Sequence, residues 1–154
     1  MNIKVLGARV GPKSTRIALV KRDGCEYELL TSGVESRLKY PADLPAVADR
    51  ALWLYREMQR LQNEHPDTAK VCIKTNDFGL TDTKSKRESA YLEGVILLHC
   101  GLSNVEVMVH TYSSLPTRSA DVKMDAERLV GRTDKYWDNP MADAVVAAWK
   151  AART

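Results

Sequence analysis

The segment from Gly7 to Ser14 nearly spells a phosphate-binding loop, in which two glycines, a lysine and a hydroxyl residue hold nucleotide phosphates. That loop requires the second glycine and the lysine to be adjacent, and a helix must follow at once so that its free amides face the phosphate. In this chain Pro12 interrupts the pair, and the residues from Thr15 to Val20 alternate like a strand. The segment therefore predicts a β-hairpin with a Gly-Pro turn, and not a nucleotide site.

Cysteine and histidine offer a second kind of chemistry, but their spacing is not that of metal ligands. The residues concerned are Cys25, Cys72, Cys100, His65, His99 and His110. No CxxC pair occurs, so we expect no zinc site. Scattered thiols without a signal peptide are typical of a reduced, cytoplasmic protein. No apolar run approaches the ~20 residues that cross a bilayer, and we expect no membrane association.

The overall composition predicts one globular domain spanning residues 1–154. A chain of 154 residues can bury a self-sufficient core without disulfides or metals. The formal net charge of +3 is too small to indicate a nucleic-acid-binding protein by itself, and it does not exclude one.

The apolar periodicity predicts three strands followed by alternating helices and strands. After the hairpin, a strand at 26–31 and a charged loop at 33–41, we expect helices at 43–64, from 85 to about 101, and from 139 onward, with strands at 70–74 and 105–109 and a short helical stretch at 124–130. Ser85 and Glu88 have the spacing of a capping box at the start of the second helix. The order strand, strand, strand, helix, strand, helix, strand, helix predicts an α/β fold with a mixed five-stranded sheet and helices on both faces.

That order, together with three short motifs, resembles the RNase H-like fold and in particular the RuvC-type Holliday junction resolvases. Residues 5–11 fit the first family strand except that Arg9 replaces its Asp. Residues 71–73 fit the fourth strand, but Lys74 follows in place of Glu. Residues 140–145 fit the start of the last helix and keep only the second of its two acids, Asp143. The resemblance spans nearly the whole chain.

The resemblance implies a degenerate catalytic site. The family cleaves phosphodiesters with carboxylates that hold two Mg²⁺ ions. Arg9 and Lys74 cannot ligate a cation, and Asp143 alone cannot hold two. We therefore expect no catalytic residues and no metal cofactor. An open alternative is an active Mg²⁺-dependent nuclease that uses relocated loop acids, with Asp138 as the nearest substitute.

The resemblance also implies that DNA or RNA binds along the face that holds the family's substrate. Basic residues expected on that face are Lys13, Arg16, Lys84, Lys86 and Arg87. We expect a binding domain that acts as a scaffold or accessory subunit, with a partner protein among its possible contacts. The alternative is a purely structural or oligomerisation module. A homodimer is predicted through the helix at 43–64, where Trp53 and Leu54 flank the main apolar stripe.

Overall fold

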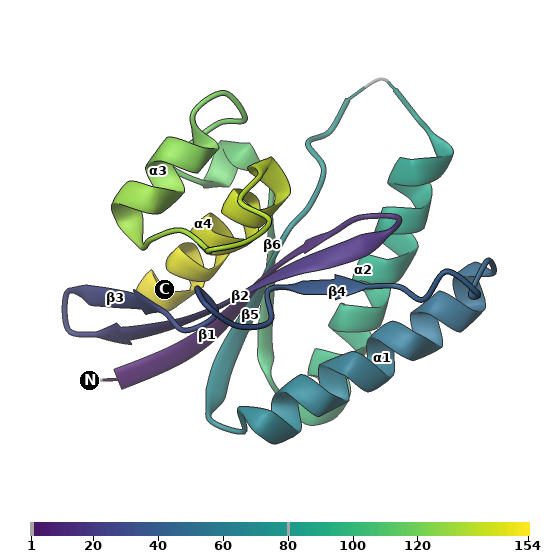
Figure 1. The fold of residues 1–154 in the computed structure, drawn as a ribbon, viewed down its shortest axis with the longest axis horizontal. Coiled ribbons are helices and arrows are strands. Elements are labelled where there is room, and N and C mark those ends of the chain that lie inside the picture. The colour runs from purple at the N-terminus through teal and green to yellow at the C-terminus, as the bar shows by residue number, and fades with distance from the viewer. Residues whose placement is uncertain (1, 80) are drawn as a thin grey trace.

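The computed structural model describes residues 2–79 and 81–154 as one mixed sheet between two helical layers (Figure 1). Its strands are β1 (Asn2–Val10), β2 (Ser14–Asp23), β3 (Glu26–Leu29), β4 (Arg37–Lys39), β5 (Thr68–Lys74) and β6 (Glu106–His110). Its helices are α1 (Val47–Glu64), α2 (Lys84–Ser103), α3 (Val122–Leu129) and α4 (Asn139–Arg153), and a short 3₁₀ turn covers Tyr112–Ser114. The predicted α/β class is confirmed, and the predicted order of elements holds apart from the additional strand β4.

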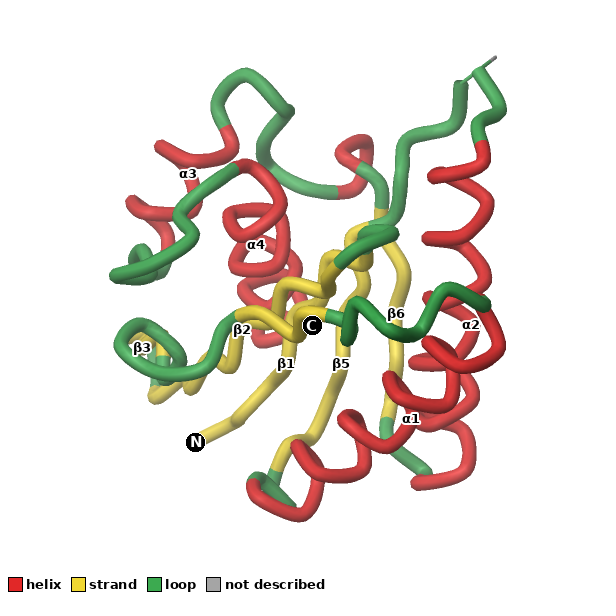
Figure 2. Tube along the Cα trace, turned by 45° about the vertical axis from the view of Figure 1, so that its right-hand side comes forward, coloured by secondary structure: helices red, strands yellow, loops and turns green. Residues whose placement is uncertain are grey.

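The sheet runs in the order β3-β2-β1-β5-β6. Strand β4 pairs with the first residues of β2, 14–16, whereas β3 pairs with its last residues, 20–23. The alternating residues of β1 and β2 form the predicted antiparallel hairpin, in which Val10 lies opposite Thr15. β5 then lies parallel to β1, and β6 lies parallel to β5. The carboxyl ends of β1, β5 and β6 consequently meet at one edge of the sheet (Figure 2).

Each face of the sheet has its own apolar core. Helix α4, flanked by α3, covers one face, whereas α1 and α2 cover the other (Figures 1 and 2). Gly7 lets α4 approach β1 closely, because a Cβ atom on it would lie 1.9 Å from the backbone oxygen of Ala144. Cys72 and Cys100 are both buried, as their apolar surroundings in the sequence predicted.

Strand β4 and helix α1 differ from the sequence-based expectations. The segment expected to be a loop contains β4, which extends the sheet beside β2. Helix α1 begins at Val47, four residues later than predicted, and Ala46 precedes it without a side-chain cap. Leu54 is fully buried beneath this helix, and Trp53 is half-buried with its ring edge-on to Tyr40. Leu54 therefore belongs to the core and cannot form the dimer edge predicted at Trp53 and Leu54, whereas the homodimer itself stays a prediction.

Helix α2 begins one residue earlier than its predicted capping residue. The hydroxyl of Thr83 accepts a hydrogen bond from the Lys86 amide, which makes Thr83 the N-cap in place of Ser85. Glu88 pairs instead with Arg50 of α1, at 3.3 Å. No helix in residues 2–79 or 81–154 is both long and apolar enough to cross a membrane.

Candidate functional site

Arg9, Lys74 and Asp143, called here the charged cluster, lie together at the carboxyl edge of the parallel strands. Arg9 Nε is 3.1 Å from Asp143 Oδ2. The same guanidinium donates to the Lys74 carbonyl at 3.2 Å and to Asn76 Oδ1 at 2.9 Å. Arg9 therefore joins the ends of β1 and β5 to helix α4.

The backbone brings these side chains together for simple reasons. The parallel pairing of β1 with β5 matches Ala8 with Ile73, so the next residues, Arg9 and Lys74, lie side by side at the carboxyl ends of their strands. Asp143 lies in the first turns of α4, which begins above this edge and packs against β1 through Gly7. The cluster thus depends on the same close helix–sheet contact that organises the core.

Tyr112 and Asp77 complete the surroundings of Lys74. The Lys74 ammonium lies 3.9 Å from the centre of the Tyr112 ring, a cation–π contact, and 3.7 Å from Asp77 Oδ1. It also donates to the Thr75 carbonyl at 2.6 Å. The Tyr112 hydroxyl donates a hydrogen bond to Asp143 Oδ1. Tyr112 thus links the cation and the anion of the cluster, and sequence analysis did not identify it.

Glu93 of α2 is a further buried acid beside the cluster. Its Oε1 accepts a hydrogen bond from the Thr75 hydroxyl at 2.9 Å. Its Oε2 is buried and has no hydrogen-bond partner among the described residues. In the sequence Glu93 lies within an apolar helix, and its inward orientation had no local signal.

Burial dominates the electrostatics of the cluster. Only 1% of the Lys74 side chain is exposed, and this burial, reinforced by the Arg9 guanidinium, holds the pKa of Lys74 below its usual value. Burial likewise raises the pKa of Glu93 and that of Asp143, although Tyr112 and Arg9 oppose the shift at Asp143. Burial therefore disfavours the charged forms of Lys74 and Asp143, and the opposite charge of each opposes that effect on the other.

A pair of divalent metal ions does not fit these residues. Both oxygens of Asp143 are engaged, one by Tyr112 and one by Arg9, and the Arg9 and Lys74 cations occupy the adjacent space. Among residues 2–79 and 81–154, no three His, Cys, Asp or Glu side chains form a group that could hold a metal. The cations contribute repulsion at the place where metal ligands would be needed.

Asp138, the predicted substitute acid, lies at the start of α4 with both oxygens in use. Its Oδ1 accepts the Met141 amide at 3.0 Å and thereby caps the helix. Its Oδ2 pairs with Arg16 at 2.7 Å. The structure therefore gives Asp138 a capping role outside the charged cluster.

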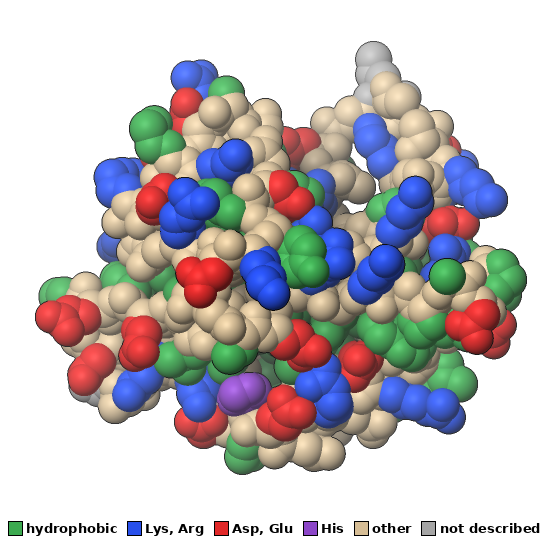
Figure 3. All heavy atoms as spheres, in the orientation of Figure 1, with side chains coloured by type: hydrophobic (Ala, Val, Ile, Leu, Met, Phe, Trp, Pro, Cys, Tyr) green, Lys and Arg blue, Asp and Glu red, His purple; other side chains and the backbone are tan. Residues whose placement is uncertain are grey.

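A basic pocket of about 380 Å³ adjoins the charged cluster. It is lined by Arg9, Lys13, Arg16 and Lys86, and it lies between the β1–β2 turn and the first turns of α2 and α4. Figure 3 shows Lys and Arg side chains gathered around a hollow at this place.

The remaining predicted basic residues, Lys84 and Arg87, do not line the basic pocket. Arg87 pairs with Asp82, at 2.5 Å, and the Lys84 side chain is 91% exposed. The predicted basic face is thus divided into residues that line the pocket and residues that project from the start of α2.

Comparison with solved structures identifies the architecture as the RNase H-like fold of the RuvC type. The chain superposes on T. thermophilus RuvC bound to a Holliday junction substrate with a TM-score of 0.76 and 15% identity, covering 99% of this chain and 93% of RuvC. The yeast mitochondrial Holliday junction resolvase Ydc2 superposes with a TM-score of 0.62 and 12% identity, covering 97% of this chain and 79% of Ydc2. The human cytomegalovirus terminase nuclease domain, soaked with Mn and inhibitor-bound, superposes with a TM-score of 0.51 and 11% identity, covering 99% of this chain and 83% of that domain. No protein-family model matches the sequence, and no curated protein matches it as a relative.

Proposed function

We propose that this chain is a RuvC-like domain that binds nucleic acid without cleaving it and acts as a scaffold or accessory subunit. The observation that carries the proposal is the charged cluster, where Arg9 and Lys74 lie at positions that the family uses for acids. Asp143 serves these cations as a counter-ion, at 3.1 Å from Arg9. The cluster in this form supports anion binding better than metal chemistry.

The basic pocket supplies a place for phosphates next to the cluster. Lys13 and Lys86 line it from opposite sides, one in the β1–β2 turn and one in the first turn of α2. Phe78 is 95% exposed in the loop that also contributes Asn76 to the pocket wall. Exposed aromatic rings beside cations are typical of surfaces that hold a phosphate backbone and stack an unpaired base.

A salt titration tests the binding proposal. Affinity for branched, duplex and single-stranded DNA and RNA should fall steeply with salt, since each phosphate contact contributes about one unit to the log–log slope. Lys13→Ala and Lys86→Ala should each weaken binding and reduce that slope by about one. Lys21→Ala, at the other end of β2, is the matched control and should leave both the affinity and the slope unchanged. Absence of binding at low salt would favour a structural module.

A cleavage assay separates the proposal from its main competitor, a Mg²⁺-dependent nuclease with relocated acids. We expect no cleavage of the same substrates with Mg²⁺ or Mn²⁺. Cleavage that disappears in Asp143→Ala protein, under conditions where that variant is folded, would refute the binding-only function. Loss in Asp138→Ala protein alone would assign the activity to the relocated acid.

We also propose that two copies pair through the outer face of α2. Tyr91, Leu98 and Leu102 are 55%, 58% and 67% exposed at helical spacings of seven and four, which gives α2 a second apolar stripe opposite its buried face. Exposed Gly94 and Gly101 flank this stripe and have open space around them, so another helix can approach closely.

Light scattering tests this assembly. The chain should be a dimer at micromolar concentration, and Leu98→Asp should make it monomeric because a charge would be buried at the contact. Leu52→Asp, at a 49% exposed position of α1, is the control and should leave the dimer intact. A monomeric wild-type chain at high micromolar concentration would contradict the proposal.

A further inference from the structure

A second cavity lies on the opposite face of the sheet from α4, below the carboxyl half of α1. Its volume is about 110 Å³. Apolar side chains from the central strands and both helices form its walls, including Leu6, Leu19, Met58 and Val71. Neither the charged cluster nor the basic pocket shares a residue with this cavity.

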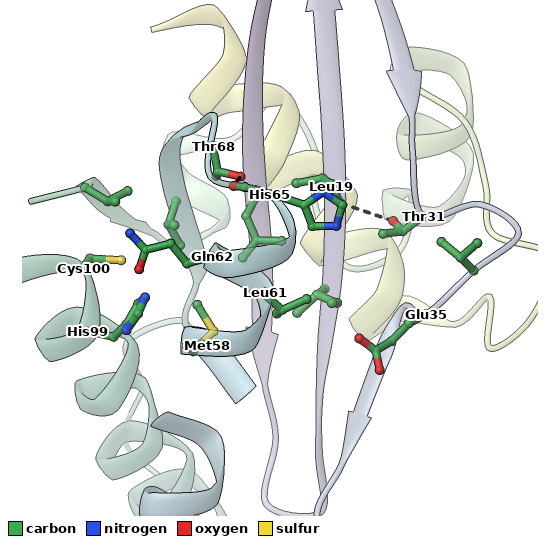
Figure 4. A pocket seen from close by; sticks show the side chains of 15 residues that line it. Leu19, Thr31, Glu35, Met58, Leu61, Gln62, His65, Thr68, His99 and Cys100 are labelled. Atoms are coloured by element: carbon green, nitrogen blue, oxygen red, sulfur yellow. Dashed lines mark hydrogen bonds between the residues drawn. The ribbon is translucent and has the colours of Figure 1, made fainter. Parts of the chain in front are cut away.

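Several polar side chains face this apolar space. Figure 4 shows Gln62 and His99 on the side of the two helices, and Thr31 and His65 near Leu19 on the side of the strands. His99 is only 4% exposed, and its ring lies edge-on to Tyr55 with centroids 5.6 Å apart. Among the described residues, no hydrogen bond is made by the His99 ring or by the Gln62 amide. The His99 ring nitrogens and the Gln62 amide are not fully shielded from solvent, so they can bond to a molecule that enters the cavity.

Among the described residues that line the cavity there is no lysine or arginine to pair with an anion. Glu35 at its rim is held by Arg60, whose guanidinium nitrogen lies 2.7 Å from the carboxylate. Burial lowers the pKa of His99, so its imidazole is neutral at pH 7 and can both donate and accept. A charged ligand would lose its hydration against apolar walls without gaining an opposite charge.

We propose that this cavity binds a small neutral molecule with one apolar ring and one hydrogen-bonding group, such as a ring hydroxyl. The size follows from the volume, because an apolar cavity of roughly 150 Å³ accommodates benzene and the present one, at 110 Å³, is open on one side. The apolar body would contact Leu19 and Met58, and the polar group would reach His99 or Gln62. Sites of this composition, largely apolar with a few converging polar groups, are typical of small-molecule pockets.

A matched series of single-ring probes tests the chemistry of the cavity. Phenol, toluene and benzoate are titrated into the purified chain while its amide resonances are followed by NMR. Phenol should bind saturably and shift resonances of residues around the cavity. It should bind at least fivefold more tightly than toluene, which lacks the polar group, and at least tenfold more tightly than benzoate, which is charged. Equal affinities for phenol and toluene, or tightest binding of benzoate, would overturn the proposal.

Two kinds of variant test its location. Val105→Phe places a ring at the cavity wall and should abolish phenol binding, whereas Val109→Phe, at a 44% exposed position of β6, should leave it unchanged. His99→Phe combined with Gln62→Leu should reduce the preference for phenol over toluene to less than twofold. Unchanged phenol binding by Val105→Phe would refute the location of the site, and so would an unchanged preference for phenol over toluene in the His99→Phe, Gln62→Leu variant. The test with the double variant stands even if Val105→Phe does not fold.

Discussion

Removal of the Asp143 carboxylate is the most direct test of the charged cluster. Asp143→Ala would leave the Arg9 guanidinium and the buried Lys74 ammonium close together without their counter-ion, and the Tyr112 hydroxyl without its acceptor. Only 4% of the Asp143 side chain and 1% of the Lys74 side chain are exposed, so water cannot replace the lost partner. Breaking a buried charge pair on one side costs about 3–5 kcal/mol.

The loss can be read as a shift of the melting temperature against a matched control on the same helix. For a domain of this size each kcal/mol lowers the melting temperature by about 2–4 °C, so Asp143→Ala should lower it by roughly 10 °C. Asp138→Ala removes a helix cap, worth about 1 kcal/mol, and a partly buried pair with Arg16 in which the Asp138 side chain is 43% exposed, so water can replace the lost carboxylate there. Its melting temperature should fall by only a few degrees.

A second substitution identifies the cause of that loss. If the uncompensated cations are responsible, Lys74→Met in the Asp143→Ala background should restore part of the lost stability, because it removes the buried ammonium. Urea unfolding at pH 7 would give the free energy of unfolding for the wild type, for Asp143→Ala, for Asp138→Ala and for the Asp143→Ala, Lys74→Met double variant. An Asp143→Ala cost no larger than that of Asp138→Ala, or a further loss on adding Lys74→Met, would show that the side chains do not act as a charge cluster.

Three other substitutions follow from the same geometry. Arg9→Asp with Lys74→Glu should crowd carboxylates around Asp143 and destabilise the chain until Mg²⁺ is added; a melting temperature indifferent to Mg²⁺ would contradict an inherited metal position. Glu93→Gln should gain stability relative to the wild type as pH rises from 4 to 8 in thermal denaturation. Burial raises the pKa of Glu93, so the unfolded wild type releases this proton at a lower pH than the native state does, and rising pH therefore favours its unfolding. A difference in melting temperature between the two proteins that does not change with pH would refute this. Gly7→Ala should cost about 3 kcal/mol or more in urea unfolding, since its Cβ would lie 2.7 Å from the Ala148 amide nitrogen. Gly79→Ala, at a loop position with open space, should be close to neutral, and equal effects of the two substitutions would argue against close α4 packing at Gly7.

The fold could be predicted from the sequence because its strongest signals are local. Alternation across the Gly-Pro turn specifies the β1–β2 hairpin, and Asn139 with Pro140 marks the start of α4, although the capping role of Asp138 appeared only in the structure. The convergence of Arg9 and Lys74 was predictable only through the resemblance, since it depends on the parallel pairing of β1 with β5.

The remaining features depend on tertiary contacts that leave no local pattern. Helix α1 has apolar residues on more than one face, so Leu54 read as an edge residue until the sheet beneath it selected which face is buried. Tyr112 is one of several polar residues after β6, and only the direction of the chain there brings its ring over Lys74. Glu88 formed a plausible capping box in sequence, yet Arg50 from another helix holds it.

The ion pair between Arg9 and Asp143 also has a consequence for the order in which the chain folds. During synthesis the β1–β2 hairpin leaves the ribosome before α4, which covers one face of the sheet. Until α4 docks, that sheet face stays open to water and the Arg9 cation has no Asp143 beside it. Contacts between such distant segments slow folding, because the intervening chain must be ordered before they form. Closure of this ion pair therefore requires α4 to dock on the sheet, and it is a reporter of that docking.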